Sequence, residues 1–121
     1  GTGASDEIGK DTAIGTTINY PLDPDCGDKE FTDIFNNSLS DKIINYNPDL
    51  ILLSAGFDAH VEDPIGGLRV TTEGFYNISK TIVKLANEVC DGKIVSSLEG
   101  GYNLKASAKS VEAHLLALKG E

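Results

Sequence analysis

Only two cysteines occur in the sequence, Cys26 and Cys90, and they form no Cys-x-x-Cys pair. A disulfide framework or a thiolate zinc site needs more cysteines at closer spacing. We therefore expect two free thiols and a reducing compartment.

Basic residues are also scarce. The chain has 10 Lys and Arg residues against 19 Asp and Glu residues, which gives a formal charge of −9. This balance disfavours nucleic-acid binding, because contacts to the phosphate backbone depend on Lys and Arg. The acids favour a solvated surface, and the alternative is that they steer a cationic substrate such as a lysine side chain.

The sequence contains no apolar run near the roughly 20 residues that a membrane-spanning helix needs. It also has no charged-then-apolar leader. We therefore expect no membrane association and a cytoplasmic location. The sequence has no methionine and its first residue is Gly1, so we expect that Gly1 lies inside a longer parent chain.

Three glycine motifs that mark common catalytic folds are missing. Gly-x-x-x-x-Gly-Lys, Gly-x-Gly-x-x-Gly and Gly-x-Ser-x-Gly do not occur. Phosphate cradles and serine-hydrolase nucleophile turns therefore lack support. A nucleotide-binding unit would also need a glycine-rich turn after its first strand, where this chain has Pro21-Leu22-Asp23-Pro24.

The hydrophobic periodicity predicts alternating strands and helices after an irregular segment over residues 1–17. A chain of 121 residues can form one core. The order predicts an α/β fold with a parallel sheet and right-handed crossovers. The expected elements are a short strand over Thr16–Leu22, a helix from Lys29 to near Asn47, a strand over Leu50–Leu53 buried on both faces, a helix from Thr71–Thr72 to Asp91, a strand over Lys93–Leu98 and a helix from Leu104 to Gly120, whose apolar side carries Leu104, Ala108, Val111, Leu115 and Leu118.

Polar residues follow the carboxyl end of the buried strand. Ligands bind at this edge in open parallel sheets, and the carboxylate of Asp58 is suited to hold a metal ion. The alternative is an Asx-turn in which Asp58 binds its own backbone. His60 could share a face with Asp58, although a surface-loop histidine is the simpler interpretation. Asp63 is interpreted as a turn residue that accepts backbone N–H bonds.

A second polar turn follows the last strand. Gly100 and Gly101 allow close approach of the backbone to a ligand. The Tyr102 phenol next to them is able to donate to a developing oxyanion. A structural tyrosine is the alternative for this motif taken alone. His114, on the last helix, lies off the expected apolar side and is expected to be solvated.

Taken together, these motifs closely resemble the histone deacetylase superfamily, which includes acetylpolyamine amidohydrolases and acetoin-utilisation proteins. The resemblance covers the carboxyl-terminal part of the family's catalytic domain, roughly its last third, and assigns residues 1–121 to that portion. The matching segments are Gly1-Thr-Gly3, Asp6-Glu7-x-Gly9, Asn19-Tyr-Pro-Leu22, Pro48-Asp49-Leu-Ile-Leu-Leu-Ser-Ala-Gly-Phe-Asp-Ala-His60, Asp63-Pro-x-Gly66 and Leu98-Glu-Gly-Gly-Tyr-Asn103.

The resemblance implies a partial three-layer αβα domain with a parallel sheet, as in arginases and deacetylases. It also implies hydrolysis of an acetylated lysine or amine by a zinc-bound water. By resemblance, Asp58 is a zinc ligand and Tyr102 polarises the acetyl carbonyl. Ile65 lines the rim of the substrate tunnel, and Gly100 and Gly101 bring the tyrosine to the metal.

The chain lacks other parts of the family's catalytic machinery. The paired histidines and the Asp-x-His ligands of the family lie upstream of the region that Gly1 matches. One aspartate does not hold a catalytic zinc, which takes three protein ligands. The isolated chain is therefore predicted to be an inactive fragment of a deacetylase, with a non-catalytic interaction module of the same fold as the alternative. An exposed sheet edge also predicts self-association.

Overall fold

The computed structural model describes residues 1–121. Its two strands are parallel neighbours, with Ile51 opposite Ile94 and Ala55 opposite Leu98. In chain order the elements are η1 (Asp11–Ala13), α1 (Asp28–Asn36), α2 (Ser38–Tyr46), β1 (Ile51–Ala55), α3 (Thr72–Cys90), β2 (Ile94–Leu98) and α4 (Leu104–Lys119).

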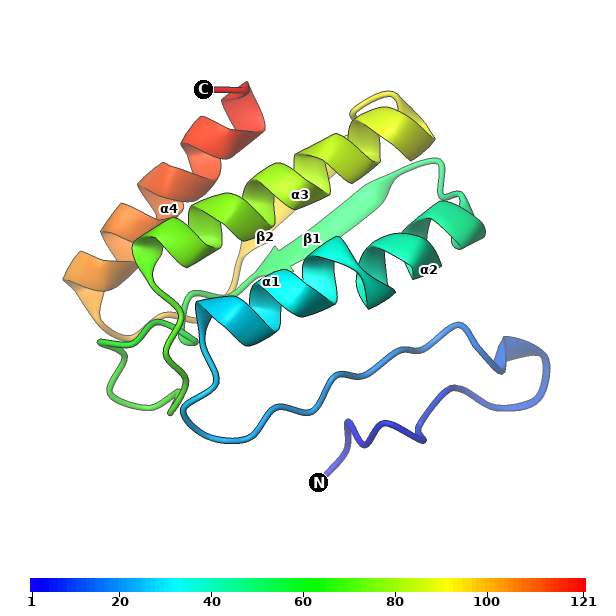
Figure 1. Ribbon diagram of the computed structural model, residues 1–121, viewed down its shortest axis with the longest axis horizontal. Helices are drawn as coiled ribbons and strands as arrows, with labels where there is room; N and C mark the ends of the chain where they lie inside the picture. The colour runs from blue at the N-terminus through cyan, green and yellow to red at the C-terminus, as the bar shows by residue number, and fades with distance from the viewer.

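The helices cover one face of this sheet. Helix α3 lies between α4 and the α1–α2 pair (Figure 1). Alternate residues of the strands pack under these helices, among them Ile51, Leu53 and Ile94. The predicted α/β class is confirmed, and the chain contains the sheet and one helical layer of the expected αβα arrangement.

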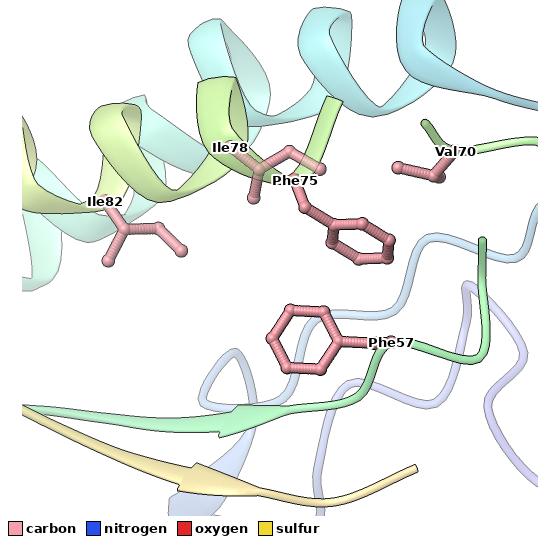
Figure 2. Packing of buried hydrophobic residues seen from close by; sticks show 5 residues of the cluster. All are labelled: Phe57, Val70, Phe75, Ile78 and Ile82. Carbon is pink, nitrogen blue, oxygen red and sulfur yellow. The ribbon is translucent and has the colours of Figure 1, made fainter. Parts of the chain in front are cut away.

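The core is centred on Phe57, directly after β1. Its ring packs edge-on against Phe75 of α3, with the ring centroids 5.0 Å apart. Figure 2 shows Phe57 pointing toward Phe75, with Ile78 and Ile82 further along α3 and Val70 on the other side of Phe75. The chain is therefore anchored in the core immediately before Asp58.

The other face of the sheet is bare. Leu52 is 73% exposed and Val95 is 56% exposed. The prediction that the first long strand is buried on both faces is therefore wrong for this chain, because no helix packs on its second face. The apolar residues there remain available for burial.

Residues Thr16–Leu22 form no strand, in contrast to the prediction. A strand needs a neighbour for its backbone ladder, and this segment runs apart from the sheet (Figure 1). It is held instead by Asn19, whose Nδ2 donates to the carbonyl oxygens of Ala4 and Glu7 at 3.0 and 3.1 Å.

The helix expected from Lys29 to Asn47 is divided in two at Asn37, which has non-helical backbone angles. The side-chain Nδ2 of Asn37 donates to the carbonyl oxygen of Asp33 at 2.9 Å. Asparagine competes in this way with backbone helix bonds, so it readily interrupts a helix.

The third and fourth helices begin and end close to the expected residues. Thr71 caps α3, and its Oγ1 accepts the N–H of Gly74 at 3.0 Å. The expected apolar side of α4 is wrong in part, since Val111 packs against the core but Leu104 is 84% exposed and Leu115 is 51% exposed. None of the helices combines the length and apolar character needed to span a bilayer. The buried side of α4 consists of Ala106, Ser110, Ala113, His114 and Ala117.

Candidate functional site

The loops that follow β1 and β2 lie side by side. The backbone N–H of Glu99 donates to the carbonyl of Ala55 at 2.9 Å, and that of Phe57 donates to the carbonyl of Gly100 at 2.8 Å. These bonds continue the parallel ladder beyond the strands. Both polar turns therefore leave the same edge of the sheet, as expected from their positions in the sequence.

Asp58 packs against the glycines of both loops. A Cβ atom at Gly100 would collide with Asp58 Oδ2, so only glycine fits there without a shift. The Asx-turn alternative is wrong for Asp58, because the N–H of His60 that it needs donates to the carbonyl of Phe57 at 3.2 Å. The half-buried carboxylate is therefore not used by its own turn.

Tyr102 stands on the neighbouring loop, and its side chain is 56% exposed. The preceding Gly101 has a φ of +137° and lies against Phe57 and Ser107. This φ favours glycine, so the sequence Gly100-Gly101 shapes the backbone that carries the phenol. The role of Tyr102 in catalysis stays a prediction.

Asp63 joins the two loops. Its Oδ1 accepts the N–H groups of Ile65 and Gly66 at 2.8 and 3.0 Å, which confirms the predicted turn. Its Oδ2 accepts the N–H of Tyr102 at 2.8 Å. Burial alone would raise the pKa of Asp63, but the backbone N–H donors outweigh it and hold that pKa below its ordinary value.

A second side chain makes a parallel connection. Asn103 Nδ2 donates to the carbonyl of Glu62 at 2.9 Å. Its Oδ1 accepts the N–H groups of Lys105 and Ala106 and so caps α4. An Asn before a helix is a recognisable cap in the sequence, whereas its bond to a loop about 40 residues away is visible only in the structure.

Ile65 lies in the turn made by Asp63 and is 71% exposed. An exposed apolar side chain at this edge is compatible with the rim of a substrate tunnel. The assignment of Ile65 to such a rim stays a prediction.

The expectation of a surface histidine at position 60 is wrong. The ring is 6% exposed and stacks on Phe75. Its Nδ1 accepts the N–H of Glu62 at 3.0 Å, and Nε2 lies 3.2 Å from Thr72 Oγ1. Both ring nitrogens thus have protein partners, so His60 is part of the packing and not a ligand.

The expectation of a solvated His114 is also wrong, because this ring is 6% exposed. Ser79 Oγ donates to the carbonyl of Phe75, so Nδ1 of His114 must donate to Ser79 Oγ, at 2.8 Å. Nε2 then accepts a hydrogen bond from the hydroxyl of Ser96, whose Oγ lies 2.9 Å away. Burial lowers the pKa of His114, and the neutral ring joins α3, α4 and β2.

The residues present do not form a complete metal site. No group of three or more His, Cys, Asp or Glu side chains is positioned to hold an ion. Asp58 supplies a single carboxylate, whereas a catalytic zinc takes three protein ligands. Within this chain, the donor set therefore does not fit zinc.

The family model for the histone deacetylase domain matches residues 1–118. The chain belongs to the histone deacetylase family. It is 45% identical over its whole length to histone deacetylase 14, chloroplastic, of Arabidopsis thaliana, and covers 29% of that protein. Over 97% of its length it is 32% identical to a probable deacetylase of Archaeoglobus fulgidus, of which it covers 33%.

Solved structures of the histone deacetylase family support the same fold. The crystal structure of the HDA15 HD domain superposes with a TM-score of 0.90 at 35% identity, over 99% of this chain and 33% of that chain. The structure of the histone deacetylase Clr3 gives a TM-score of 0.90 at 30% identity, with 98% and 19% covered. The chain thus spans about a third or less of these relatives.

Proposed function

We propose that residues 1–121 form the carboxyl-terminal portion of the catalytic domain of a metal-dependent amidohydrolase. The reaction would remove acetyl groups from acetyl-lysine or from acetylated amines. One observation carries this proposal: Asp58 and Tyr102 leave the same edge of the sheet on loops that are bonded to each other. Family membership makes deacetylation the chemistry to test at that edge.

In the complete domain, Asp58 would contribute one oxygen ligand to zinc. A zinc ion bound there would activate a water molecule for attack on the amide. The hydroxyl of Tyr102 would donate a hydrogen bond to the acetyl oxygen as negative charge develops on it. Gly100 and Gly101 would allow the close approach of the two loops, and Ile65 would contact the substrate at the tunnel rim.

The isolated chain is proposed to be inactive. Its only histidines are buried, and each ring nitrogen lies within hydrogen-bond distance of a protein group. Neither ring is therefore free to act as a general base or as a second ligand. The chain should neither retain stoichiometric zinc nor hydrolyse an acetyl-lysine peptide, and zinc-dependent turnover by the chain alone would refute this part of the proposal.

The full-length gene product tests the roles of the two side chains. Asp58→Asn should lower both zinc content and deacetylation of an acetyl-lysine peptide. Tyr102→Phe should keep the zinc and lower kcat about 100-fold, the usual loss for one oxyanion donor. Tyr46→Phe is a matched control, since Tyr46 is 74% exposed on α2 and should leave both measurements unchanged. Wild-type activity in Tyr102→Phe would refute the proposed role.

One observation favours the alternative, a non-catalytic interaction module. The bare sheet face presents Leu52 and Val95, which are apolar and mostly exposed. Such a module would still bind its partner in a double variant that combines Asp58→Ala with Tyr102→Phe. A deacetylase would lose its activity in the same double variant.

The acidic charge of −9 supports the proposal that no nucleic acid is bound. We propose a cytoplasmic location and self-association through the sheet edge. Two plant relatives are named chloroplastic, so imaging of a fluorescent fusion in the source cells is the appropriate test of location. A plastid signal would overturn the cytoplasmic proposal.

A further inference from the structure

Asp63 has two separate tasks, one for each carboxylate oxygen. Oδ1 accepts the N–H groups of Ile65 and Gly66 and closes the local turn. Oδ2 accepts the N–H of Tyr102, which is 39 residues away in the sequence. The local turn therefore uses only half of the side chain.

We propose that Asp63 is a positioning residue that holds Tyr102 in place relative to Asp58. The inference rests on the proposed function, in which the Tyr102 phenol is a hydrogen-bond donor. Asp63 itself need not touch substrate or metal. It acts on the backbone from which the phenol projects.

The loop around Tyr102 needs such a connection. The side chain of Tyr102 is 56% exposed, so packing does little to hold this residue in place. Two glycines precede it, and Gly101 has a φ of +137°, where backbone freedom is large. A catalytic donor must nevertheless be held close to its productive position, because a misplacement of about 1 Å can cost about 100-fold in rate.

The connection explains why position 63 carries an acid. An asparagine would serve the turn equally well, since its single carbonyl oxygen can accept the two local N–H groups. It would then present its NH₂ group to the N–H of Tyr102, and two donors do not bond. Only a carboxylate offers acceptors on both sides, and its charge strengthens the bond.

This difference makes Asp63→Asn a selective variant that keeps the turn and loses the bond to Tyr102. Asn103→Asp is its counterpart, because Asp keeps the cap on α4 but loses the donor to Glu62. Asp28→Asn is the matched control. Asp28 also bonds a distant backbone N–H, that of Thr71 at 2.7 Å, but it makes no bond to the Tyr102 loop.

The first measurement is amide hydrogen exchange in the 121-residue chain, followed by NMR. In Asp63→Asn the Tyr102 amide should exchange about 10- to 100-fold faster, as expected for loss of a bond to a charged acceptor. The amides of Ile65 and Gly66 should keep their protection. Asp28→Asn should leave all three amides unchanged. An unchanged Tyr102 amide in Asp63→Asn, or equal acceleration in Asp28→Asn, would overturn the inference.

The second measurement is steady-state kinetics of the full-length gene product with an acetyl-lysine peptide. Asp63→Asn should lower kcat about 100-fold while KM and zinc content stay near wild type, because only the donor is displaced. Asn103→Asp should act in the same direction, since it removes the second connection between the loops. Asp28→Asn should retain wild-type kinetics.

The Tyr102→Phe variant separates the two proposals. If it is inactive while Asp63→Asn keeps the wild-type kcat, the positioning role is refuted and the deacetylase proposal survives. If Tyr102→Phe is fully active, the phenol has no role in deacetylation. The proposal that Asp63 supports catalysis by positioning Tyr102 is then refuted as well.

Discussion

The two faces of the small sheet differ sharply, although their residues are similar in the sequence. On the inner face, Leu53 packs against the core under the helices. On the outer face, its neighbour Leu52 is 73% exposed. Strand side chains alternate between the faces, so adjacent leucines have opposite surroundings.

The comparison shows which apolar residues are packed within this chain and which stay mostly exposed. Inner-face residues such as Leu53 are partly buried against the core under the helices. Outer-face residues such as Val95, which is 56% exposed, are covered less. The chain spans 29% to 33% of the length of several relatives.

The largest expected effect comes from removing an inner-face aromatic. Phe57→Ala should destabilise the chain by about 3 to 5 kcal/mol, since it leaves a cavity beside Phe75. Urea unfolding followed by circular dichroism measures the change. Tyr46→Ala is the control, because Tyr46 is 74% exposed and its loss should change stability by less than about 0.5 kcal/mol. Similar losses for both variants would contradict the assignment of the core.

An intermediate effect is expected from pH, through His114 between the sheet and the helices. Burial lowers its pKa below the ordinary value of 6.5, so the folded state keeps the ring neutral. Below pH 6.5, His114 binds a proton in the unfolded chain but not in the folded chain, where the ring is buried. Stability is therefore fully present above pH 6.5 and falls as the pH decreases.

The slope should be at most about 1.4 kcal/mol per pH unit for this one proton. Unfolding by urea at several pH values measures it, and His114→Gln should remove this part of the slope. NMR titration of the wild-type ring gives an independent check. A ring pKa at or above 6.5 would contradict the prediction.

The smallest effect on stability is expected on the outer face. Leu52→Thr combined with Val95→Thr should change the free energy of unfolding by less than about 0.5 kcal/mol. The proposed self-association uses the sheet edge and not this face, and it is measured separately by sedimentation of the wild-type chain over a range of concentrations. Leu53→Thr is the matched control in the same strand, and it should destabilise the fold. A wild-type chain that stays monomeric at high concentration would rule out self-association.

Much of the fold was predictable because local patterns act within single elements. The helical repeat of Phe75, Ile78 and Ile82 and the cap at Thr71 predicted α3. The predicted strand over Thr16–Leu22 failed because its β-branched residues find no neighbouring ladder. Local propensity alone does not provide one.

The candidate site was predictable in its location but not in its connections. Strand order and the polar turns placed Asp58 and Tyr102 at one edge. The bond from Tyr102 to Asp63 spans 39 residues, so no local pattern reports it. Both histidines were misplaced because residues of other elements bury them, Phe75 of α3 in the case of His60 and Ser79 and Ser96 in the case of His114.

Short-range patterns and motifs were enough to predict the parallel α/β order, the family and the edge of the sheet at which polar residues gather. The burial of one strand face, the place of both histidines in the core and the side-chain bonds between the two loops were visible only in the folded chain. Those outcomes depend on contacts between residues far apart in the chain, whose geometry is set when the helices pack on the sheet.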